Sequence, residues 1–173
     1  MTDPDAAAGP AAAGAKPDPD PDEAFADYGW DAPGTPAGAL VFGVDGEGRV
    51  LMQLRDDRPD VTHGGVFSPF GGGVEAGETL RQAAVREMIE ETGLGLPAER
   101  LTPFARIVSD TASRTRLYHY VCRLAVPPEA VKVQEGAGFG FLTPAQLRSF
   151  PMASPVQRMV LDLADQVERG ETP

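Results

Sequence analysis

The chain has 173 residues, enough for one domain with a sizeable hydrophobic core. Its formal net charge of −11 argues against a protein that holds long nucleic acid by its own surface charge, and a single cysteine, Cys122, excludes an internal disulfide framework. The sequence shows no apolar run long enough to span a membrane and no N-terminal signal segment, so we expect a cytoplasmic protein.

The first 36 residues differ in composition from the rest of the chain. They are rich in Ala, Pro, Gly and Asp and contain almost no aliphatic side chain larger than Ala. Such a segment buries too little apolar surface to offset the entropy lost on ordering. We therefore predict a disordered acidic tail at residues 1–36 and one domain at residues 37–173. Phe25, Tyr28 and Trp30, near the end of the tail, are candidates for docking on the domain.

Apolar runs separated by turn residues predict a series of strands after the tail. The runs Leu40–Val44 and Val50–Leu54 are partly β-branched, and Asp45–Gly48 between them has the composition of a hairpin turn. A polar loop and a short strand at Val66–Ser68 precede a run of glycines. Further strands are expected at Phe104–Val108, Arg116–Val126 and Phe139–Leu142.

Capping residues predict three helices. The longest is expected to begin at Thr79 and end at Gly93. A brief helix opens at Thr143-Pro144, and Ser154-Pro155 is expected to cap a final helix that runs to about Val167. The strands and helices interleave without the regular alternation of a doubly wound fold. We therefore expect an α/β (α+β) fold in which a mixed sheet lies between helical layers. On the longest helix the apolar arc expected to pack on the sheet consists of Ala84, Val85, Met88 and Ile89.

Three carboxylates share another face of the longest helix. Glu87, Glu90 and Glu91 stand at spacings i, i+3 and i+4, so their charges repel one another. A divalent cation would remove this conflict, and the oxygen ligands suit Mg²⁺ or Mn²⁺ rather than zinc, which prefers Cys and His. The alternative is a solvated charged face on which Arg86 pairs with Glu90.

The glycine run and the helix together read GGVEAGETLRQAAVREMIEETGL. This stretch resembles the Nudix box, whose pattern is Gly, five residues, Glu, seven residues, Arg-Glu, an aliphatic residue, any residue, Glu-Glu, any residue, Gly and an aliphatic residue. Every fixed position is matched, with methionine accepted as aliphatic. The resemblance implies a Nudix-like α/β/α sandwich and a hydrolase of acid anhydrides in phosphorus-containing compounds. The matching positions are Gly72, Glu78, Arg86, Glu87, Met88, Glu90, Glu91, Gly93 and Leu94.

The resemblance also implies a metal-binding set. Glu87 and Glu91 would ligate Mg²⁺, with Mn²⁺ as a substitute, and Glu90 would serve as a ligand or as the general base. A backbone carbonyl near Gly72 or Gly73 would complete the ligands, and a glycine-rich loop allows the backbone such a close approach. The implied reaction is cleavage of a nucleoside diphosphate linked to a moiety X by metal-activated water.

Two further roles follow from the resemblance, and each has a second interpretation. Arg86 would orient a neighbouring glutamate. Glu78 would support the loop or a metal-bound water, although an anion in the first turn of a helix also favours the helix dipole. The general base often lies in a later loop in this family, where Glu135 is the candidate; Glu90 is the rival, and Glu135 could equally be a solvated side chain.

The residues that bind substrate are predicted more weakly, because the box does not specify X. Arg55 and Arg116 lie in or beside loops that could reach phosphates, and Phe70 stands where a smaller residue is common before the box. Surface charge or core packing would also account for each. The expected partner is a small nucleotide, namely a nucleotide sugar, ADP-ribose or a (d)NTP, with no long nucleic acid and no membrane. Homodimers are common among Nudix proteins, but no sequence feature indicates one.

Two other functions remain open on this fold. A non-catalytic Nudix-like module would bind or sense a nucleotide, but it predicts a damaged box, and the box is intact. Isomerisation of isoprenoid diphosphates would call for a reactive cysteine near the cleft. Cys122 lies in a strand-like run and is expected to be a small core residue.

Overall fold

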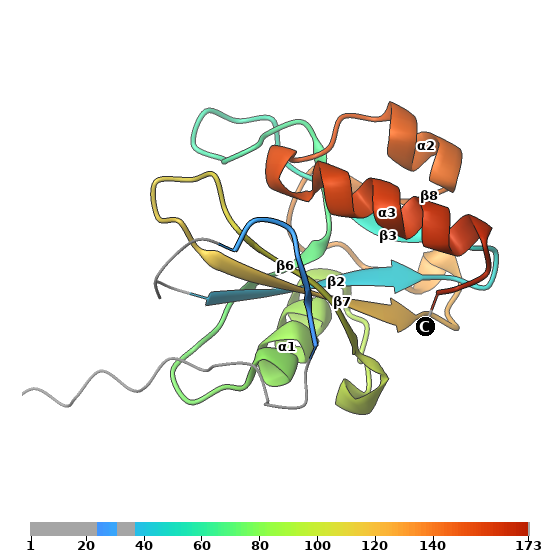
Figure 1. Cartoon of the computed structure of the whole chain (residues 1–173), viewed down its shortest axis with the longest axis horizontal. Helices are drawn as coiled ribbons and strands as arrows, with labels where there is room; N and C mark the ends of the chain where they lie inside the picture. The colour runs from blue at the N-terminus through green and yellow to red at the C-terminus, as the bar shows by residue number, and fades with distance from the viewer. Residues whose placement is uncertain (1–23, 31–36, 173) are drawn as a thin grey trace, which may run out of the picture.

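A mixed β-sheet lies between two helical layers in the computed structural model, which describes residues 24–30 and 37–172 (Figure 1). Helix α1 (Leu80–Thr92) covers one face of the sheet, and α2 (Pro144–Ser149) and α3 (Gln157–Glu168) cover the other. This architecture is the α/β/α sandwich expected from the sequence. Within the described residues no helix has the length and apolar character needed to cross a membrane.

The sheet has the strand order β1-β6-β7-β2-β3-β4, with β5 paired to β2 and β8 paired to β3. At its centre β2 runs parallel to β7 and antiparallel to β3 and β5. Three short 3₁₀ turns, Ala98–Arg100, Pro128–Ala130 and Ser154–Val156, connect the larger elements. The strands are β1 (Ala26–Asp27), β2 (Ala37–Val44), β3 (Val50–Leu54), β4 (Phe67–Ser68), β5 (Phe70–Gly73), β6 (Thr102–Val108), β7 (Arg116–Arg123) and β8 (Gly138–Leu142).

Strand β2 builds both hydrophobic cores because its side chains alternate between the two faces of the sheet. Ala39 and Val41 pack in the core beneath α1. Phe42 and Val44 pack in the core beneath α2 and α3. A strand covered on both faces reads as a continuous apolar run, which is why the sequence identified this segment easily.

Helix α1 has the ends that the sequence predicted. The Thr79 side chain accepts from the Gln82 amide and the Gln82 side chain accepts from the Thr79 amide, which forms a capping box. Gly93 ends the helix with a left-handed φ of 71°. One position of the predicted apolar arc is wrong, because Ile89 is 49% exposed. The buried arc instead contains Leu80 and Ala83 beside the expected Ala84 and Met88, so the helix is rotated relative to the prediction.

Two elements differ from the sequence prediction. The glycine run is not a loop: Phe70–Gly73 forms a strand, β5, because β2 offers it a hydrogen-bonding edge. Ser154 and Pro155 belong to a 3₁₀ turn, and α3 begins only at Gln157. Both differences depend on neighbouring elements that are distant in sequence.

Residues 24–30 pack onto the domain, although composition placed them in the predicted tail. Ala26–Asp27 pairs in parallel with β6 and extends the sheet by one short strand. Phe25 makes edge contacts with Tyr118 and Tyr120 at centroid distances of 5.3 Å each, and Trp30 lies 5.1 Å from Tyr118. The aromatic residues therefore hold this segment in place, as their presence in the sequence suggested. The remainder of the predicted tail lies outside the described residues.

We predict that Phe25→Ala lowers the free energy of unfolding by about 1 to 2 kcal/mol, because the ring loses two aromatic contacts at a partly buried site. Urea denaturation of the full chain measures the change. The control is Leu161→Ala on the exposed side of α3, which should alter stability by less than about 0.5 kcal/mol. Equal stabilities for the Phe25 variant and the wild type would show that this segment adds nothing to the domain in solution.

Candidate active site

A glycine strand forms the floor of the site. Gly71 and Gly72 of β5 pair with Leu40 and Ala39 of β2. Gly71 has a φ of +134°, and a Cβ there would lie 2.3 Å from the Ala39 carbonyl oxygen. At Gly72 a Cβ would lie 2.6 Å from Oε1 of Glu87. Glycine is therefore needed at Gly71, where the neighbour is backbone; at Gly72 the neighbour is the movable end of Glu87, whose carboxylate lies directly against the Gly72 backbone.

Glu91 is buried against the same strand. It is only 9% exposed, and its Oε2 accepts a hydrogen bond of 2.8 Å from the Gly71 amide. The pKa of the Glu91 carboxyl is raised to about 7, chiefly by burial; the Glu87 and Glu135 carboxylates also raise this pKa, whereas the Gly71 amide and Arg55 lower it. A buried carboxyl with two like neighbours is a characteristic of sites that bind a cation.

Arg86 connects the carboxylates of α1 to the loop before it. Its guanidinium donates to Glu78 through two nitrogens, at 2.8 and 3.0 Å, and to Glu87 at 2.8 Å. It also donates to Glu90 at 3.1 Å and to the Gly73 carbonyl at 2.8 Å. These bonds use the full donor capacity of a guanidinium. Arg86 therefore contacts each of the glutamates that the Nudix resemblance would have it orient.

Glu78 supports the loop between β5 and α1. It accepts both bonds from Arg86 and a further bond of 3.0 Å from the Glu75 amide. The Arg86 guanidinium is the main cause of a lowered pKa at the Glu78 carboxyl. Because its oxygens are occupied by these donors, Glu78 acts on the site through Arg86 and the loop.

Glu135 reaches the site from a loop far along the chain. The Gln134 amide donates to the Glu91 carbonyl at 3.0 Å, and the Gln53 side chain donates to the Glu135 carbonyl at 3.2 Å. These bonds hold the loop against the end of α1 and against β3. The structure thus places Glu135 near enough to Glu91 to raise the pKa of the Glu91 carboxyl.

The carboxylates of the site are suitable ligands for a hard divalent cation, although their oxygens accept hydrogen bonds from protein donors in this structure. Within residues 24–30 and 37–172, no three His, Cys, Asp or Glu side chains converge as a ready-made metal cluster. Arg86 donates to Glu87 and Glu90, and the Gly71 amide donates to Glu91, so the mutual repulsion of the carboxylates is offset only in part. A cation at the site would compete with Arg86 for these carboxylates. Only oxygen donors are present, and they favour Mg²⁺ or Mn²⁺.

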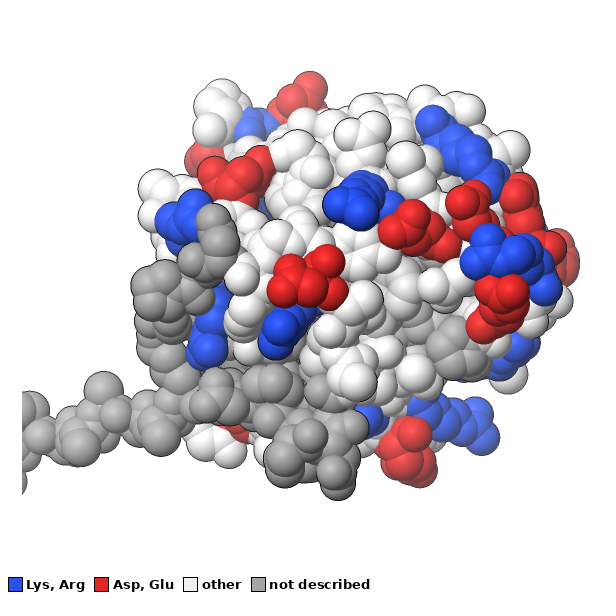
Figure 2. Space-filling view, viewed as in Figure 1, with Lys and Arg blue, Asp and Glu red and all other residues white. Residues whose placement is uncertain are grey.

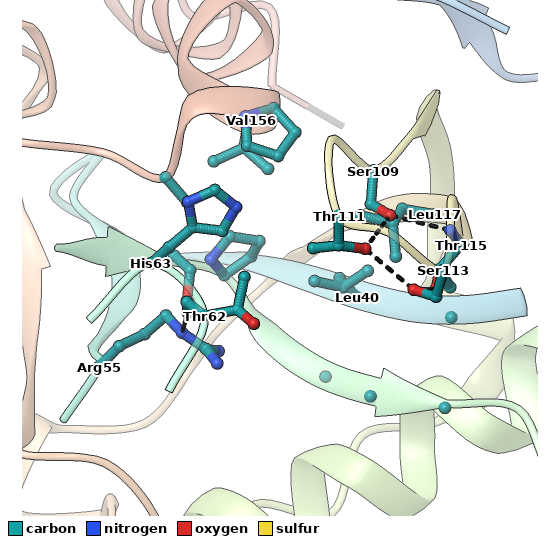
Figure 3. Close-up of a pocket in the computed structure, with 18 of the residues that line it drawn as sticks. Leu40, Arg55, Thr62, His63, Ser109, Thr111, Ser113, Thr115, Leu117 and Val156 are labelled. Atoms are coloured by element: carbon teal, nitrogen blue, oxygen red, sulfur yellow. Dashed lines mark hydrogen bonds between the residues drawn. The ribbon is translucent and has the colours of Figure 1, made fainter. Parts of the chain in front are cut away.

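A cavity of about 450 Å³ opens beside the glycine strand, and a second of about 350 Å³ lies next to Glu135. Arg55 and Thr62 line both cavities, so the two meet at these residues. The Arg55 Nε donates to the Thr62 carbonyl at 2.8 Å, which fixes the guanidinium at the junction. Figure 3 shows Arg55, Thr62 and His63 along one side of the larger cavity. Arg55 therefore remains a candidate for binding phosphate.

Two residues predicted to bind substrate lie elsewhere. Phe70 is fully buried in the core beneath α1, because its side chain points to the opposite face of β5 from the cavity. Arg116 is 7% exposed and lines neither cavity. On β7 the cavity side is occupied by the next residue, Leu117. Both corrections have the same physical reason. Side chains alternate between the two faces of a strand, and the sequence alone does not say which face a given side chain is on.

Two features around the larger cavity were not predicted from the sequence: the hydrogen bonds of Asp110 and a row of hydroxyl groups. Asp110 joins two loops by bonding the His63 ring at 2.9 Å and the Ser154 hydroxyl. The hydroxyls of Ser109, Thr111, Ser113 and Thr115 line one wall. Their spacing of two residues is visible in the sequence, but only the hairpin between β6 and β7 turns it toward the site. Cys122, by contrast, is buried in the core as expected.

Comparisons with known proteins identify the family and the fold. A model of the NUDIX domain matches residues 34–163. A mutT/nudix family protein from Listeria innocua has a TM-score of 0.63 and 22% identity, covering 82% of this chain and 98% of that one. The NUDIX domain of Shewanella oneidensis NrtR, solved with ADP-ribose, has a TM-score of 0.61 and 16% identity, covering 78% and 89%. At these identities the structures show the shared fold.

A curated relative matches over a shorter stretch. The octanoyltransferase of Myxococcus xanthus is 48% identical over 59 residues, which make up 34% of this chain and 15% of that protein. This chain therefore spans only a small part of that relative. The NUDIX model covers most of the chain, so the chain belongs to the Nudix family.

We predict that Glu91→Gln stabilises the protein at high pH when divalent cations are absent. The pKa of Glu91 is about 7 when folded against an ordinary value of 4.5, so the folded state binds more protons between these values and loses stability as pH rises through them. Glutamine keeps an oxygen for the Gly71 amide without the charge. The gain should be about 2 to 3 kcal/mol at pH 8 and near zero at pH 4.5.

Denaturation in a chelator at the two pH values measures this difference. Glu99→Gln, at an exposed position of the Ala98–Arg100 turn, is the control and should have no pH-dependent effect. A Glu91→Gln variant that is no more stable than the wild type at pH 8 would contradict the raised pKa.

Proposed function

We propose that the protein is a Mg²⁺-dependent pyrophosphohydrolase that cleaves a nucleoside diphosphate linked to a moiety X. Two observations carry this proposal: the Glu87 and Glu91 carboxylates lie against the glycine strand, with Glu135 and Arg55 close enough to Glu91 to affect its pKa, and Arg55 stands where the two cavities meet. A diphosphate placed at this junction would extend one end into each cavity. Nucleotide sugars, ADP-ribose and (d)NTPs all have that two-ended form.

The surface favours a small nucleotide over long nucleic acid. On the face drawn in Figure 2, basic side chains are scattered among acidic ones and form no continuous basic tract. With a net charge of −11, the protein has little attraction for a long phosphate backbone. The NUDIX domain solved with ADP-ribose is a structural relative that binds a small nucleotide, which supports the same class of ligand.

In this mechanism Glu87 and Glu91 would hold Mg²⁺, together with a backbone carbonyl of the glycine strand. When bound, the cation would neutralise diphosphate oxygens and lower the pKa of a coordinated water. Arg86 keeps Glu87 turned toward the strand, and Arg55 would contact a diphosphate oxygen. Glu135 would take the proton from the attacking water, because its loop lies beside Glu91 and lines the second cavity.

We predict that Glu87→Gln and Glu91→Gln each lower kcat for the best substrate by at least about 100-fold, because each removes an anionic ligand. A Mg²⁺-dependent screen of nucleotide sugars, ADP-ribose and (d)NTPs, with chromatography of the products, identifies that substrate. Glu129→Gln, which alters an exposed carboxylate outside the site, should keep wild-type activity. Full activity in both site variants would contradict the proposed function. Tight nucleotide binding without turnover would favour the sensing module.

A second comparison separates the two candidates for the general base. Glu90 is 58% exposed and held by Arg86, whereas Glu135 lies near Glu91. We therefore expect Glu135→Gln to lower kcat by about 100-fold or more and to remove the acidic limb of the pH–rate profile. Glu90→Gln should lower kcat by less than about 10-fold and keep that limb. The reverse pattern would assign the base to Glu90.

A further inference from the structure

The hairpin loop between β6 and β7 presents a row of four hydroxyls to the larger cavity. Ser109 and Thr111 lie 2.8 Å apart, Thr111 and Ser113 2.9 Å, and Ser113 and Thr115 2.9 Å, measured between hydroxyl oxygens. In Figure 3 they form one wall, facing Arg55, Thr62 and His63 across the cavity. The row is thus continuous and lies opposite the proposed phosphate site.

The row is fixed by the backbone of its own loop. The Thr115 amide donates to the Ser109 hydroxyl at 2.8 Å, and the Ser109 amide donates to the Thr115 carbonyl at 2.8 Å. The Arg114 amide also donates to the Thr111 carbonyl at 2.9 Å. Because these bonds close the loop, the hydroxyls of Thr111 and Ser113 keep their place without a ligand. A preformed wall of this kind loses little entropy when a ligand binds.

The row can both donate and accept hydrogen bonds. Either oxygen of each pair can be the donor, so the direction of bonding along the row can reverse. Each hydroxyl has one hydrogen and two lone pairs, unlike a guanidinium, which only donates. Such a wall suits a ligand that itself carries hydroxyls, because a sugar hydroxyl also donates and accepts.

The rest of the cavity lining favours the same kind of ligand. Leu40, Leu117 and Val156 supply apolar surface, which suits the C–H face of a sugar ring. Among the described residues of this lining, Arg55 has the only guanidinium and no Phe, Tyr or Trp is present. A triphosphate chain would call for several cations, and Arg55 alone supplies a permanent positive charge in this lining. The cavity beyond Arg55 therefore suits a neutral, polyhydroxylated group.

We propose that the Ser109–Thr115 hydroxyl row binds the sugar of a nucleoside diphosphate sugar, so that X is a pentose or hexose. The inference rests on the proposed hydrolase function and narrows its substrate. The diphosphate lies at Arg55, the sugar enters the larger cavity, and the nucleoside extends toward the cavity beside Glu135. Thr111 and Ser113 determine specificity by contacting the sugar hydroxyls.

The test is the double variant Thr111→Val/Ser113→Ala, which removes two hydroxyls and keeps the shape of the loop. Ser109 and Thr115 stay unchanged because they close the loop. Loss of two hydrogen bonds should raise KM for ADP-ribose and for ADP- and UDP-glucose roughly tenfold, with kcat/KM for dGTP within about twofold. Thr111→Ser/Ser113→Thr keeps both hydroxyls and should keep wild-type KM. Ser149→Ala, a remote hydroxyl on α2, is the control for removing a serine.

The outcomes separate this inference from the function on which it rests. If the wild type hydrolyses (d)NTPs but no nucleotide sugar, the hydrolase stands and the sugar assignment is overturned. If the wild type hydrolyses nothing, calorimetry compares ADP-ribose with ADP. Tighter binding of ADP-ribose that the double variant loses supports the sugar site, and equal affinities overturn it. Should the double variant fail to fold, Ser113→Ala alone, at an exposed position, gives the same comparison.

Discussion

The hydrogen bonds of Arg86 are the constraint on which the rest of the site depends. One guanidinium donates to Glu78, Glu87, Glu90 and the Gly73 carbonyl, so a single side chain fixes the positions of three glutamates. Without it, like charges on one helix face would repel and their rotamers would scatter. Lysine could not replace it, because an ammonium lacks the planar array of donors. The same bonds hold the loop before α1, so the positions of the carboxylates depend on the path of the backbone in this loop.

The glycine strand is the second half of this arrangement. Because Gly71 and Gly72 have no side chains, β5 can lie against β2 on one side and against the Glu87 and Glu91 carboxylates on the other. The cost is a buried carboxyl at Glu91 with a raised pKa. Burial of the Glu91 carboxylate lowers the stability of the folded protein, and a bound cation would recover that stability. The helix, the strand and the guanidinium therefore form one unit, which the cores beneath α1 and α3 hold rigid.

Loops from distant parts of the chain complete the cleft around this unit. The Gln134 amide and the Gln53 side chain hold the Glu135 loop against α1 and β3. On the other side Asp110 bonds both His63 and Ser154, which ties the β6–β7 hairpin to two further loops. Arg55 stands between the two cavities. Helix α1 therefore carries the Glu87 and Glu91 carboxylates, and the loops form the walls of the cavities that a ligand would enter.

The sequence by itself determined the local chemistry, and the tertiary structure decided what meets it. The Nudix box, the caps of α1 and the paired carboxylates follow from spacing along one helix, so they could be read directly. The exposure of Ile89 and the burial of Phe70 and Arg116 could not be predicted from the sequence, because the face to which a side chain points depends on its packing partners. Likewise, only the fold shows that the loop of Glu135 lies beside Glu91. The hydroxyl row was visible as a repeat, but only the fold of the β6–β7 hairpin turns it into a wall of the cavity.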